Sequence, residues 1–275
     1  MAAINIIYDP NAQPTLLQQA DINEAAHQWG ATIQDAVNIQ ISVMSLPLGG
    51  AHNAMCIPGI VQHAGQTLTR AQAKLQHVAI VDPAAVPLDM LILIDSATPW
   101  VTGFAPAPVV GPHQFSLLTT MLHEMCHGFG ILGLCNVAHA AGIYSDPGLT
   151  ALLPPVAPAS FFPPGLQSGF GWITPFAAQF AYQGVLAILT KGIPADDYVA
   201  FMSASGNVVI PVGATNYTVL TGNNNFVPFT TCDHVVGNDA ITHQPYLMSS
   251  TTLGQFMGQP DASSRALLHT IGWNC

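Results

Sequence analysis

The segment Ser116–Gly130 reads SLLTTMLHEMCHGFG, and it decides how the rest of the chain is interpreted. Its first half is apolar enough to be buried, and Ser116 is a typical N-cap residue. The glycines that begin at position 128 offer places where a helix ends. We therefore expect a buried helix from Ser116 to about His127.

This predicted helix carries the pattern H-E-x-x-H at His123, Glu124 and His127. Residues four apart lie on one face of a helix, so two imidazoles can bind the same ion. Glu124 lies about 100° around the helix from His123, where its carboxylate can take a proton from water and return it to a leaving amine. Zinc fits this set best, since it accepts two neutral nitrogens, a third protein ligand and an open position for water. The alternative is a surface helix with an incidental histidine pair, but a buried apolar helix has little reason to carry these residues unless a metal satisfies them.

Charged residues are scarce in the chain and limit its function classes. The 275 residues include 4 Lys or Arg and 14 Asp or Glu, so 7% are charged, against about 25% in a typical soluble domain. Four scattered cations cannot form a phosphate-binding stripe, so we expect no nucleic-acid partner. No apolar run approaches the roughly 18 to 20 residues that cross a bilayer, so we expect no transmembrane segment. Half of the residues are hydrophobic, which suffices for one large domain or two subdomains that share a cleft.

The third metal ligand does not follow from the motif itself. Glu124 and Glu24 are the only two Glu in the chain, so no downstream Glu can serve. The pattern continues to Gly130 as HExxHxxG, but Gly133 stands where HExxHxxGxxH has its third His. The ligand must therefore come from farther along the chain. The candidates are His139, His234, His243 and His269, with Asp146 and Asp233 as weaker carboxylate options.

The C-terminal part of the chain resembles the end of the leishmanolysin-type metzincins, a family of zinc metallopeptidases. The resemblance rests on three segments, numbered 232–234 (CDH), 246–248 (YLM) and 265–273 (RALLHTIGW). In that family a long insertion follows HExxHxxG. A distant His then completes the site shortly before a Met-turn, and the closing helix ends in Gly and an aromatic residue.

By this resemblance His234 is the third ligand, with His243 and His139 as alternatives, and Met248 forms a floor beneath the histidines. Two features depart from the family. The spacing from position 234 to position 248 is longer than expected, and Ser250 stands where metzincins often have a Tyr that stabilises the transition state. Tyr246 is a weaker candidate for that role.

The resemblance also implies a fold and an activity. The fold is an α+β zincin in which residues 1–130 form an upper subdomain, with a mixed sheet plus two helices, that ends in the active-site helix. Residues 131–275 form an irregular, loop-rich lower subdomain, and the two make one catalytic domain. The activity is that of an endopeptidase acting on protein or peptide substrates, with Zn²⁺ held by His123, His127 and His234 and with Glu124 as general base. The alternatives are an inactive, zinc-stabilised binding protein and a metallohydrolase of non-peptide amides or esters.

Hydrophobic periodicity predicts the remaining elements. We expect strands over residues 4–8, 37–45 and 90–95, and two short strands within 208–219 that are broken at 211–214. We expect helices over residues 15–36, 69–78, 175–191 and 263–271. Segments rich in Pro, Gly or Asn predict loops over residues 46–65, 103–112, 134–164 and 222–243.

The cysteines and the N-terminus say little about compartment. The five cysteines, at positions 56, 126, 135, 232 and 275, form no CxxC pair, so no cysteine-based zinc site is expected. Their odd number leaves at least one thiol free or paired between chains. The start of the sequence has no basic and apolar leader. If Met1 is an added start residue, an extracellular location is expected, and otherwise a cytoplasmic one; the oligomeric state stays open.

Overall fold

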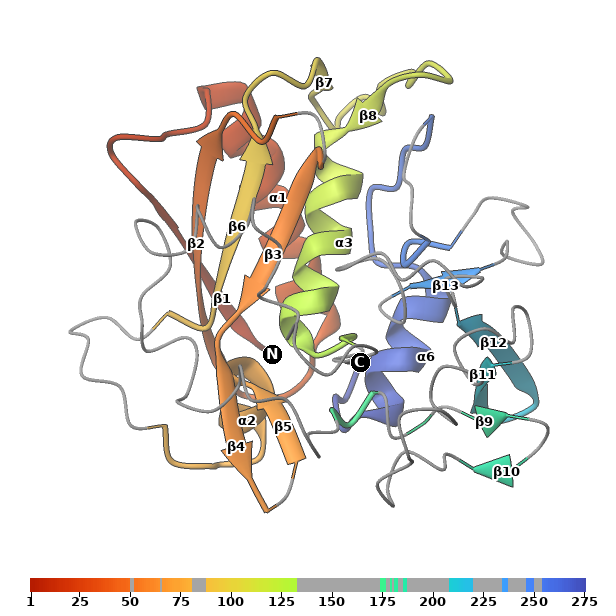
Figure 1. Ribbon diagram of the computed structural model, residues 1–275. Helices are drawn as coiled ribbons and strands as arrows, with labels where there is room; N and C mark the ends of the chain where they lie inside the picture. The colour runs from red at the N-terminus through yellow and green to blue at the C-terminus, as the bar shows by residue number, and fades with distance from the viewer. Residues whose placement is uncertain are drawn as a thin grey trace.

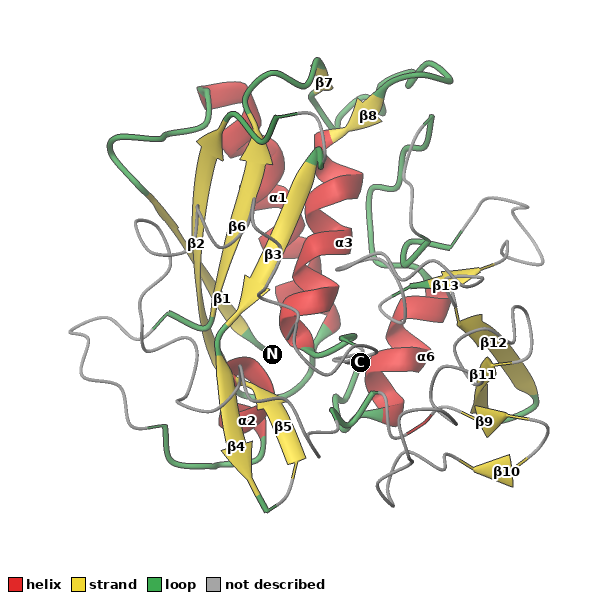
Figure 2. Ribbon diagram, in the orientation of Figure 1, coloured by secondary structure: helices red, strands yellow, loops and turns green. Residues whose placement is uncertain are grey.

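The computed structural model describes residues 1–49, 52–64, 66–80, 88–132, 174–176, 179, 181–182, 185–186, 208–219, 234–236, 246–249 and 254–275. In these residues four helices and four sheets form a mixed α and β fold (Figures 1 and 2). This agrees with the expected mixture of helices and sheets. Among the same residues, no helix combines the length and the apolar character needed to cross a membrane.

The main sheet has four strands in the order β1-β2-β6-β3. Strands β1 (Ala3–Tyr8), β2 (Asn38–Leu46) and β6 (Met90–Asp95) run parallel, while β3 (Ala54–Pro58) pairs antiparallel with β6 at one edge. All six residues of β6 are buried. A nearly continuous apolar run such as MLILID fits a central strand that is covered on both faces.

Helices α1 (Leu16–Thr32) and α3 (Leu117–Phe129) lie together against one face of this sheet (Figure 1). Helix α1 begins at a capping box in which Thr15 and Gln18 satisfy each other's backbone amides. The Trp29 indole Nε1–H donates to the Leu122 carbonyl at 3.0 Å, which joins the two helices. Apolar side chains also cover the opposite face of the sheet, and these are Ala12, Met44, Met55, Ile57, Leu91 and Leu93.

A small unit lies beyond β3. Strands β4 (Ile60–His63) and β5 (Gln66–Thr69) form a hairpin that leads directly into α2 (Arg70–Leu75). At the end of α2, Lys74 Nζ donates to the buried carboxylate of Asp89, the residue before β6. Burial raises the pKa of Asp89, and the bond from Lys74 opposes that shift. The pair therefore fastens α2 beneath the main sheet.

The later part of the chain adds a second sheet and a closing helix. Its strands follow the order β10-β9-β11-β12-β13, and every neighbouring pair is antiparallel. Their bounds are β9 Ala181–Tyr182, β10 Val185–Leu186, β11 Val208–Val212, β12 Thr215–Val219 and β13 Val235–Val236. Short strands β7 (Trp100–Val101) and β8 (Phe115–Ser116) pair just before α3.

Helix α6 (Ala262–Thr270) connects the C-terminus to α3. The Trp273 indole Nε1–H donates to the Phe129 carbonyl at 2.8 Å. The Phe129 ring lies 5.3 Å from the ring of Trp29 and 5.6 Å from that of Trp273, measured between centroids. Helix α3 is thus held from one side by α1 and from the other by the C-terminal segment.

Most of the expected elements are confirmed. These include the strands near 4–8, 37–45 and 90–95, the helices near 69–78 and 263–271, and the two short strands within 208–219. The helix expected over 15–36 ends earlier, at Thr32. The N-terminal part to residue 130 contains a third helix, α2, where the fold class named two. The predicted loop 134–164 falls outside the described residues. Of the loop predicted over 222–243, the structure describes 234–236, and the prediction is wrong at Val235–Val236, which form β13 because they pair with β12.

The loop predicted over 46–65 is wrong, since it contains β3 and β4. Pro58 and Gly59 suggested a break, but Pro58 is the last residue of an edge strand. Cys56 and Pro58 are two positions apart, so their backbone nitrogens face the same way, and the Cys56 N–H points to Glu124 of α3 and away from β6. The missing N–H of Pro58 therefore removes no ladder hydrogen bond.

The helix predicted over 175–191 is also wrong, since Ala181–Tyr182 and Val185–Leu186 are antiparallel strands. The pairing of Tyr182 with Val185 leaves only two residues between the strands, and the second is Gly184. Glycine in a two-residue connection is a hairpin signal. The apolar periodicity of the segment outweighed this signal in the prediction.

The contact between α3 and the sheet can be tested at Gly128. A Cβ added there would lie 2.1 Å from Met90 Sδ, which is fully buried in β6. We expect Gly128→Ala to lower the free energy of unfolding by about 1–3 kcal/mol, because the core must shift to admit the methyl group. Gly258→Ala is the control, since its nearest neighbour would be 3.7 Å away. Equal denaturation midpoints for the two variants would contradict this packing.

Candidate metal centre

The local structure of α3 explains why its polar residues face inward. Ser116 caps the helix, and its side chain accepts from the Thr119 N–H at 3.3 Å. Every residue of the helix is buried. The helix ends at Gly130, whose φ of 116° is left-handed, and a Cβ there would lie 2.4 Å from Gln72 Cδ. Only glycine satisfies both conditions.

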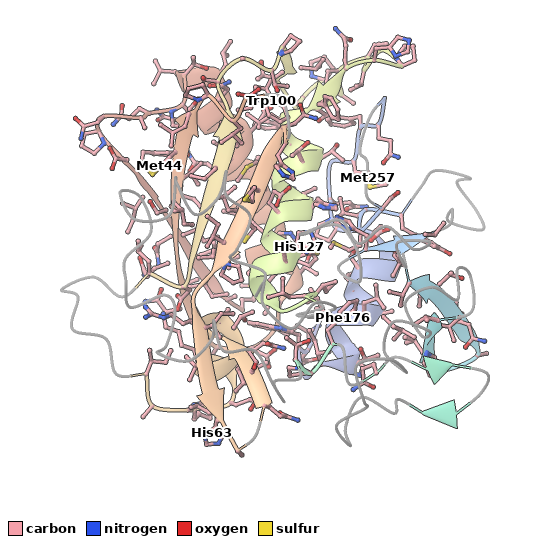
Figure 3. The ribbon with its side chains drawn as sticks, viewed as in Figure 1. Met44, His63, Trp100, His127, Phe176 and Met257 are labelled. Carbon is pink, nitrogen blue, oxygen red and sulfur yellow. The ribbon has the colours of Figure 1, made fainter. Side chains whose placement is uncertain are left out.

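Three buried histidines meet at one point beside α3. His123 and His127 come from this helix, and His234 directly precedes β13 (Figure 3 labels His127). The Nε2 atom of His123 lies 3.1 Å from that of His127 and 3.1 Å from that of His234. Each of the three residues is at most 7% exposed. They lie close enough to bind a metal ion, so the expected set of His123, His127 and His234 is brought together.

Hydrogen bonds determine which ring nitrogen of His123 and of His127 faces the point where the three histidines meet. His123 Nδ1 lies 2.5 Å from the Leu247 carbonyl oxygen, and His127 Nδ1 lies 2.7 Å from that of Ile131. A carbonyl oxygen only accepts, so each Nδ1 carries the proton and donates it. In the neutral rings both Nε2 atoms are then unprotonated.

The donor set fits a metal better than a hydrogen-bond network. His123 Nε2 and His127 Nε2 are both acceptors, so their 3.1 Å contact joins two lone pairs with no proton between them. A cation at the meeting point removes this conflict. In a tetrahedral zinc site, Zn–N bonds of about 2.0–2.1 Å place neighbouring nitrogens about 3.3–3.4 Å apart. This is close to the 3.1 Å between the Nε2 atoms.

Burial keeps these imidazoles neutral and ready to act as ligands. It lowers the pKa of His123 to about 4, against a smaller opposite effect of its bond to Leu247. Burial and the two neighbouring histidines hold the pKa of His127 well below its usual value. Metal ligation requires the neutral ring, so no proton has to be displaced at pH 7.

Glu124 lies on the same helix, next to His123, and is also buried. Its carboxylate accepts a hydrogen bond from the Cys56 backbone N–H of edge strand β3. Burial raises the pKa of Glu124 to about 8, and this bond opposes the shift. A divalent cation at the three histidines would favour the ionised carboxylate further. The sequence predicted Glu124 as a carboxylate beside the metal, and the structure places it buried on the helix that carries His123 and His127.

The turn at 246–249 closes the centre from the C-terminal side. The Ser249 N–H donates to the Tyr246 carbonyl at 2.9 Å, and Leu247 and Met248 are fully buried. The Leu247 carbonyl accepts from His123, and the Met248 carbonyl accepts from the N–H of Val235, the residue after His234. The turn thus contacts one ligand directly and the neighbour of another.

Other predicted residues have different outcomes. His139, His243 and Ser250 fall outside the described residues, so the alternatives for the third ligand and for the missing Tyr stay predictions. The Tyr246 ring packs 5.6 Å from that of Tyr217 in β12. His269 Nδ1 contacts the Trp273 carbonyl at 3.1 Å on α6. Of the cysteines in the described part of the chain, Cys56, Cys126 and Cys275 are free.

Sequence reasoning missed the groups that orient the centre. They are the backbone carbonyls of Leu247 and Ile131, the backbone N–H of Cys56 and the carboxylate of Asp261. Backbone groups carry no sequence signal. Asp261 did carry one, since an Asp directly before an apolar helical segment is a capping pattern.

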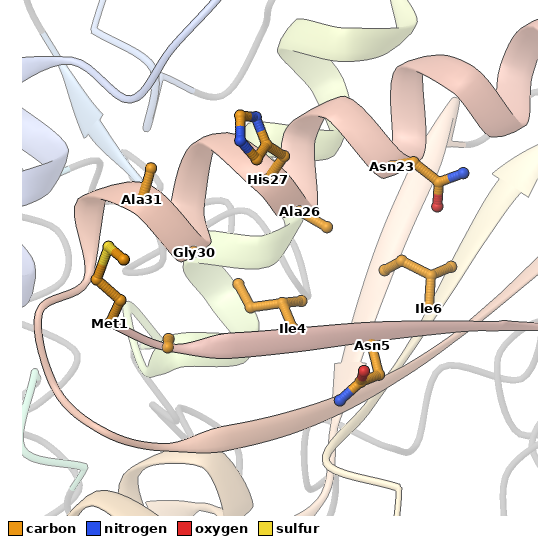
Figure 4. Close-up of a pocket in the computed structure, with 10 residues that line it drawn as sticks. Met1, Ile4, Asn5, Ile6, Asn23, Ala26, His27, Gly30 and Ala31 are labelled. Atoms are coloured by element: carbon orange, nitrogen blue, oxygen red, sulfur yellow. The ribbon is translucent and has the colours of Figure 1, made fainter.

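A separate cavity of about 540 Å³ lies between β1 and α1 (Figure 4). Its lining includes Ile4, Ile6, Asn23 and His27 and none of the three histidines of the metal centre. Strand β1 forms the edge of the sheet opposite β3. The cavity therefore lies at the opposite edge of the main sheet from β3, the strand that contacts Glu124.

Comparison with protein-family models, with curated proteins and with solved structures finds no match to this chain. Support for a function of this chain therefore comes from the geometry of the centre.

The ligand set predicts the metal content of two variants. His234→Ala should lose most of the bound metal, because two nitrogens on one helix bind far more weakly than three convergent ones. His243→Ala should keep one metal per chain. Elemental analysis after dialysis measures both. Loss of metal in His243→Ala, with retention in His234→Ala, would assign the third ligand to His243.

Metal removal should also lower stability, because an ion that binds only the folded state stabilises it by mass action. We expect a chelator to reduce the melting temperature of the wild-type protein by several degrees, and excess Zn²⁺ to restore it. The His123→Ala variant is the control and should show no response to either addition. A wild-type melting curve that ignores both would argue against a metal in this centre.

Proposed function

We propose that the chain is a zinc-dependent endopeptidase related to the leishmanolysin-type metzincins. One observation carries the proposal: a buried glutamate, Glu124, lies beside three convergent histidines and faces the free edge of strand β3. In this assignment His123, His127 and His234 hold Zn²⁺. The bound ion supplies Lewis-acid chemistry, since it polarises a carbonyl and makes water more acidic.

Glu124 moves the proton in this mechanism. Its carboxylate accepts a proton from the attacking water and holds it while the new carbon–oxygen bond forms. It then donates that proton to the amide nitrogen of the leaving group, and the carbon–nitrogen bond breaks. The Cys56 N–H holds the carboxylate at the edge of β3, where the proposed substrate would lie.

Strand β3 offers the main chain on which an extended substrate can lie. It is the edge of the sheet, and its antiparallel pairing with β6 uses the odd-numbered positions, as the bond from the Asp95 N–H to the Asn53 carbonyl shows. The even-numbered residues Ala54, Cys56 and Pro58 therefore direct their carbonyl groups to the free edge, while the Cys56 N–H is taken by Glu124 and Pro58 has no N–H. A peptide added there as a further strand lies next to Glu124, which is the arrangement that peptide hydrolysis requires.

The metzincin resemblance gives names to the remaining parts. The turn around Met248 corresponds to the Met-turn, and α6 with Gly272 and Trp273 corresponds to the closing segment. The separation into an upper subdomain that ends in α3 and a lower one that carries His234 belongs to the same proposal. Met248 is fully buried, as a floor beneath the histidines would be.

The proposed role of Glu124 predicts a specific pattern in Glu124→Gln. This variant keeps the size of the side chain but removes the base, so zinc should remain bound while peptide hydrolysis falls about 10²- to 10⁴-fold. Glu24→Gln is a matched control, because Glu24 is the only other glutamate and lies on α1. It should hydrolyse peptides like the wild type. The measurement is cleavage of casein or a quenched fluorescent peptide, with and without a chelator.

Three outcomes separate the candidate functions. Chelator-sensitive proteolysis that Glu124→Gln abolishes supports the peptidase. Zinc binding without hydrolysis of any peptide or ester overturns it in favour of a zinc-stabilised binding protein. Hydrolysis of non-peptide amides or esters alone, with the same dependence on Glu124, overturns it in favour of a different metallohydrolase.

A further inference from the structure

Asp261 uses both carboxylate oxygens to join two segments that lie next to the metal centre. Oδ1 accepts from the Ser264 N–H at 2.8 Å and caps the start of α6. Oδ2 accepts from the Leu247 N–H at 3.0 Å and from the Ser263 hydroxyl at 2.6 Å. A helix cap needs only one of these oxygens. The second one fastens the turn at 246–249 to the N-terminus of α6.

The same turn holds the surroundings of two metal ligands through adjacent carbonyls. The Leu247 carbonyl accepts from His123 Nδ1, so the peptide group that Asp261 fixes belongs to the residue that orients a ligand. The Met248 carbonyl accepts from the Val235 N–H at 2.9 Å, next to His234. The contacts therefore run from Asp261 to the turn, and from the turn to His123 and to the strand that begins after His234.

We infer that Asp261 is a positioning residue of the metal centre, which sets metal affinity by holding the 246–249 turn where one carbonyl orients His123 and the next accepts from the Val235 N–H beside His234. The inference rests on the metal centre of the proposed function and is independent of peptide hydrolysis. Partners that orient ligating histidines typically change metal affinity about 10- to 100-fold when they are removed. Here the carboxylate acts one hydrogen bond farther out, on the residue whose carbonyl is that partner.

Two substitutions separate this role from simple helix capping. Asp261→Ser keeps a side-chain oxygen that can cap α6 but has no second oxygen for the Leu247 N–H. Asp261→Asn keeps the shape but has only one acceptor oxygen for the two amides. Thr15→Ala is the control, because it removes the cap of α1 and its bond to the Gln18 N–H, on a helix that carries no ligand. All three lose some stability, but only the first two should change the metal centre.

The experiment measures the dissociation constant of Zn²⁺ by competition with a chromophoric chelator, and the visible absorption of the Co²⁺-loaded proteins. We expect the dissociation constant to rise about 10-fold or more in Asp261→Ser and Asp261→Asn, with a shifted Co²⁺ spectrum. Thr15→Ala should bind Zn²⁺ like the wild type and give an unchanged spectrum. If one Asp261 variant does not fold, the other gives the answer.

Each outcome decides a different point. Wild-type affinity and spectrum in both Asp261 variants overturn the inference and leave Asp261 as a helix cap. A comparable loss of affinity in Thr15→Ala also overturns it, because general loosening of the fold then explains the effect. A wild-type protein that binds no Zn²⁺ overturns the metal centre together with this inference. A wild-type protein that binds Zn²⁺ but hydrolyses no peptide overturns only the proposed activity.

Discussion

The hydrogen bonds from two imidazole Nδ1 atoms to backbone carbonyls constrain the centre more than any other interaction. They orient His123 and His127 so that their Nε2 lone pairs point at each other at 3.1 Å, which is unfavourable without a cation. The two carbonyls belong to Ile131, just after the Gly130 turn, and to Leu247, more than a hundred residues away. The end of one helix and a distant turn must therefore be placed correctly before the ligands can converge.

The packing of α3 meets this requirement. A helix whose residues are all buried needs apolar partners on every side, and here α1, the sheet and the C-terminal segment supply them. Trp29 and Trp273 each donate an indole hydrogen bond to a carbonyl of α3, and both pack against Phe129. Burial is also what keeps the ligating histidines neutral, so the same packing that positions the centre prepares its chemistry.

The sequence predicted the parts of the centre that depend on periodicity within one segment. The spacing of His123 and His127 on an apolar helix, the cap at Ser116 and the buried strand 90–95 are such local patterns, and the structure has them. His234 was ranked from a resemblance, because no local pattern distinguishes one loop histidine from another. Strand β3 was missed because Pro58 and Gly59 suggested a break, although a proline at this position of an edge strand removes no ladder hydrogen bond. The strands at 181–186 were missed because pairing with a distant strand, β11, outweighed an apolar pattern that also fits a helix.

The chain contains few cationic side chains that could keep the buried carboxylate of Glu124 ionised. Burial, opposed by the bond from the Cys56 N–H, raises the pKa of Glu124 to about 8, so without a neighbouring positive charge this residue is a poor base at pH 7. The chain has only 4 Lys and Arg residues. Two of them, Lys74 and Arg70, lie near the buried carboxylate of Asp89 and lower its pKa. In the described part of the chain, the Cys56 backbone N–H lowers the pKa of Glu124, and no cationic side chain contributes to the shift of this pKa. In the proposed function, an ion held by the three histidines would be the charge that keeps Glu124 ionised, so the glutamate would depend on the metal for its role as a base.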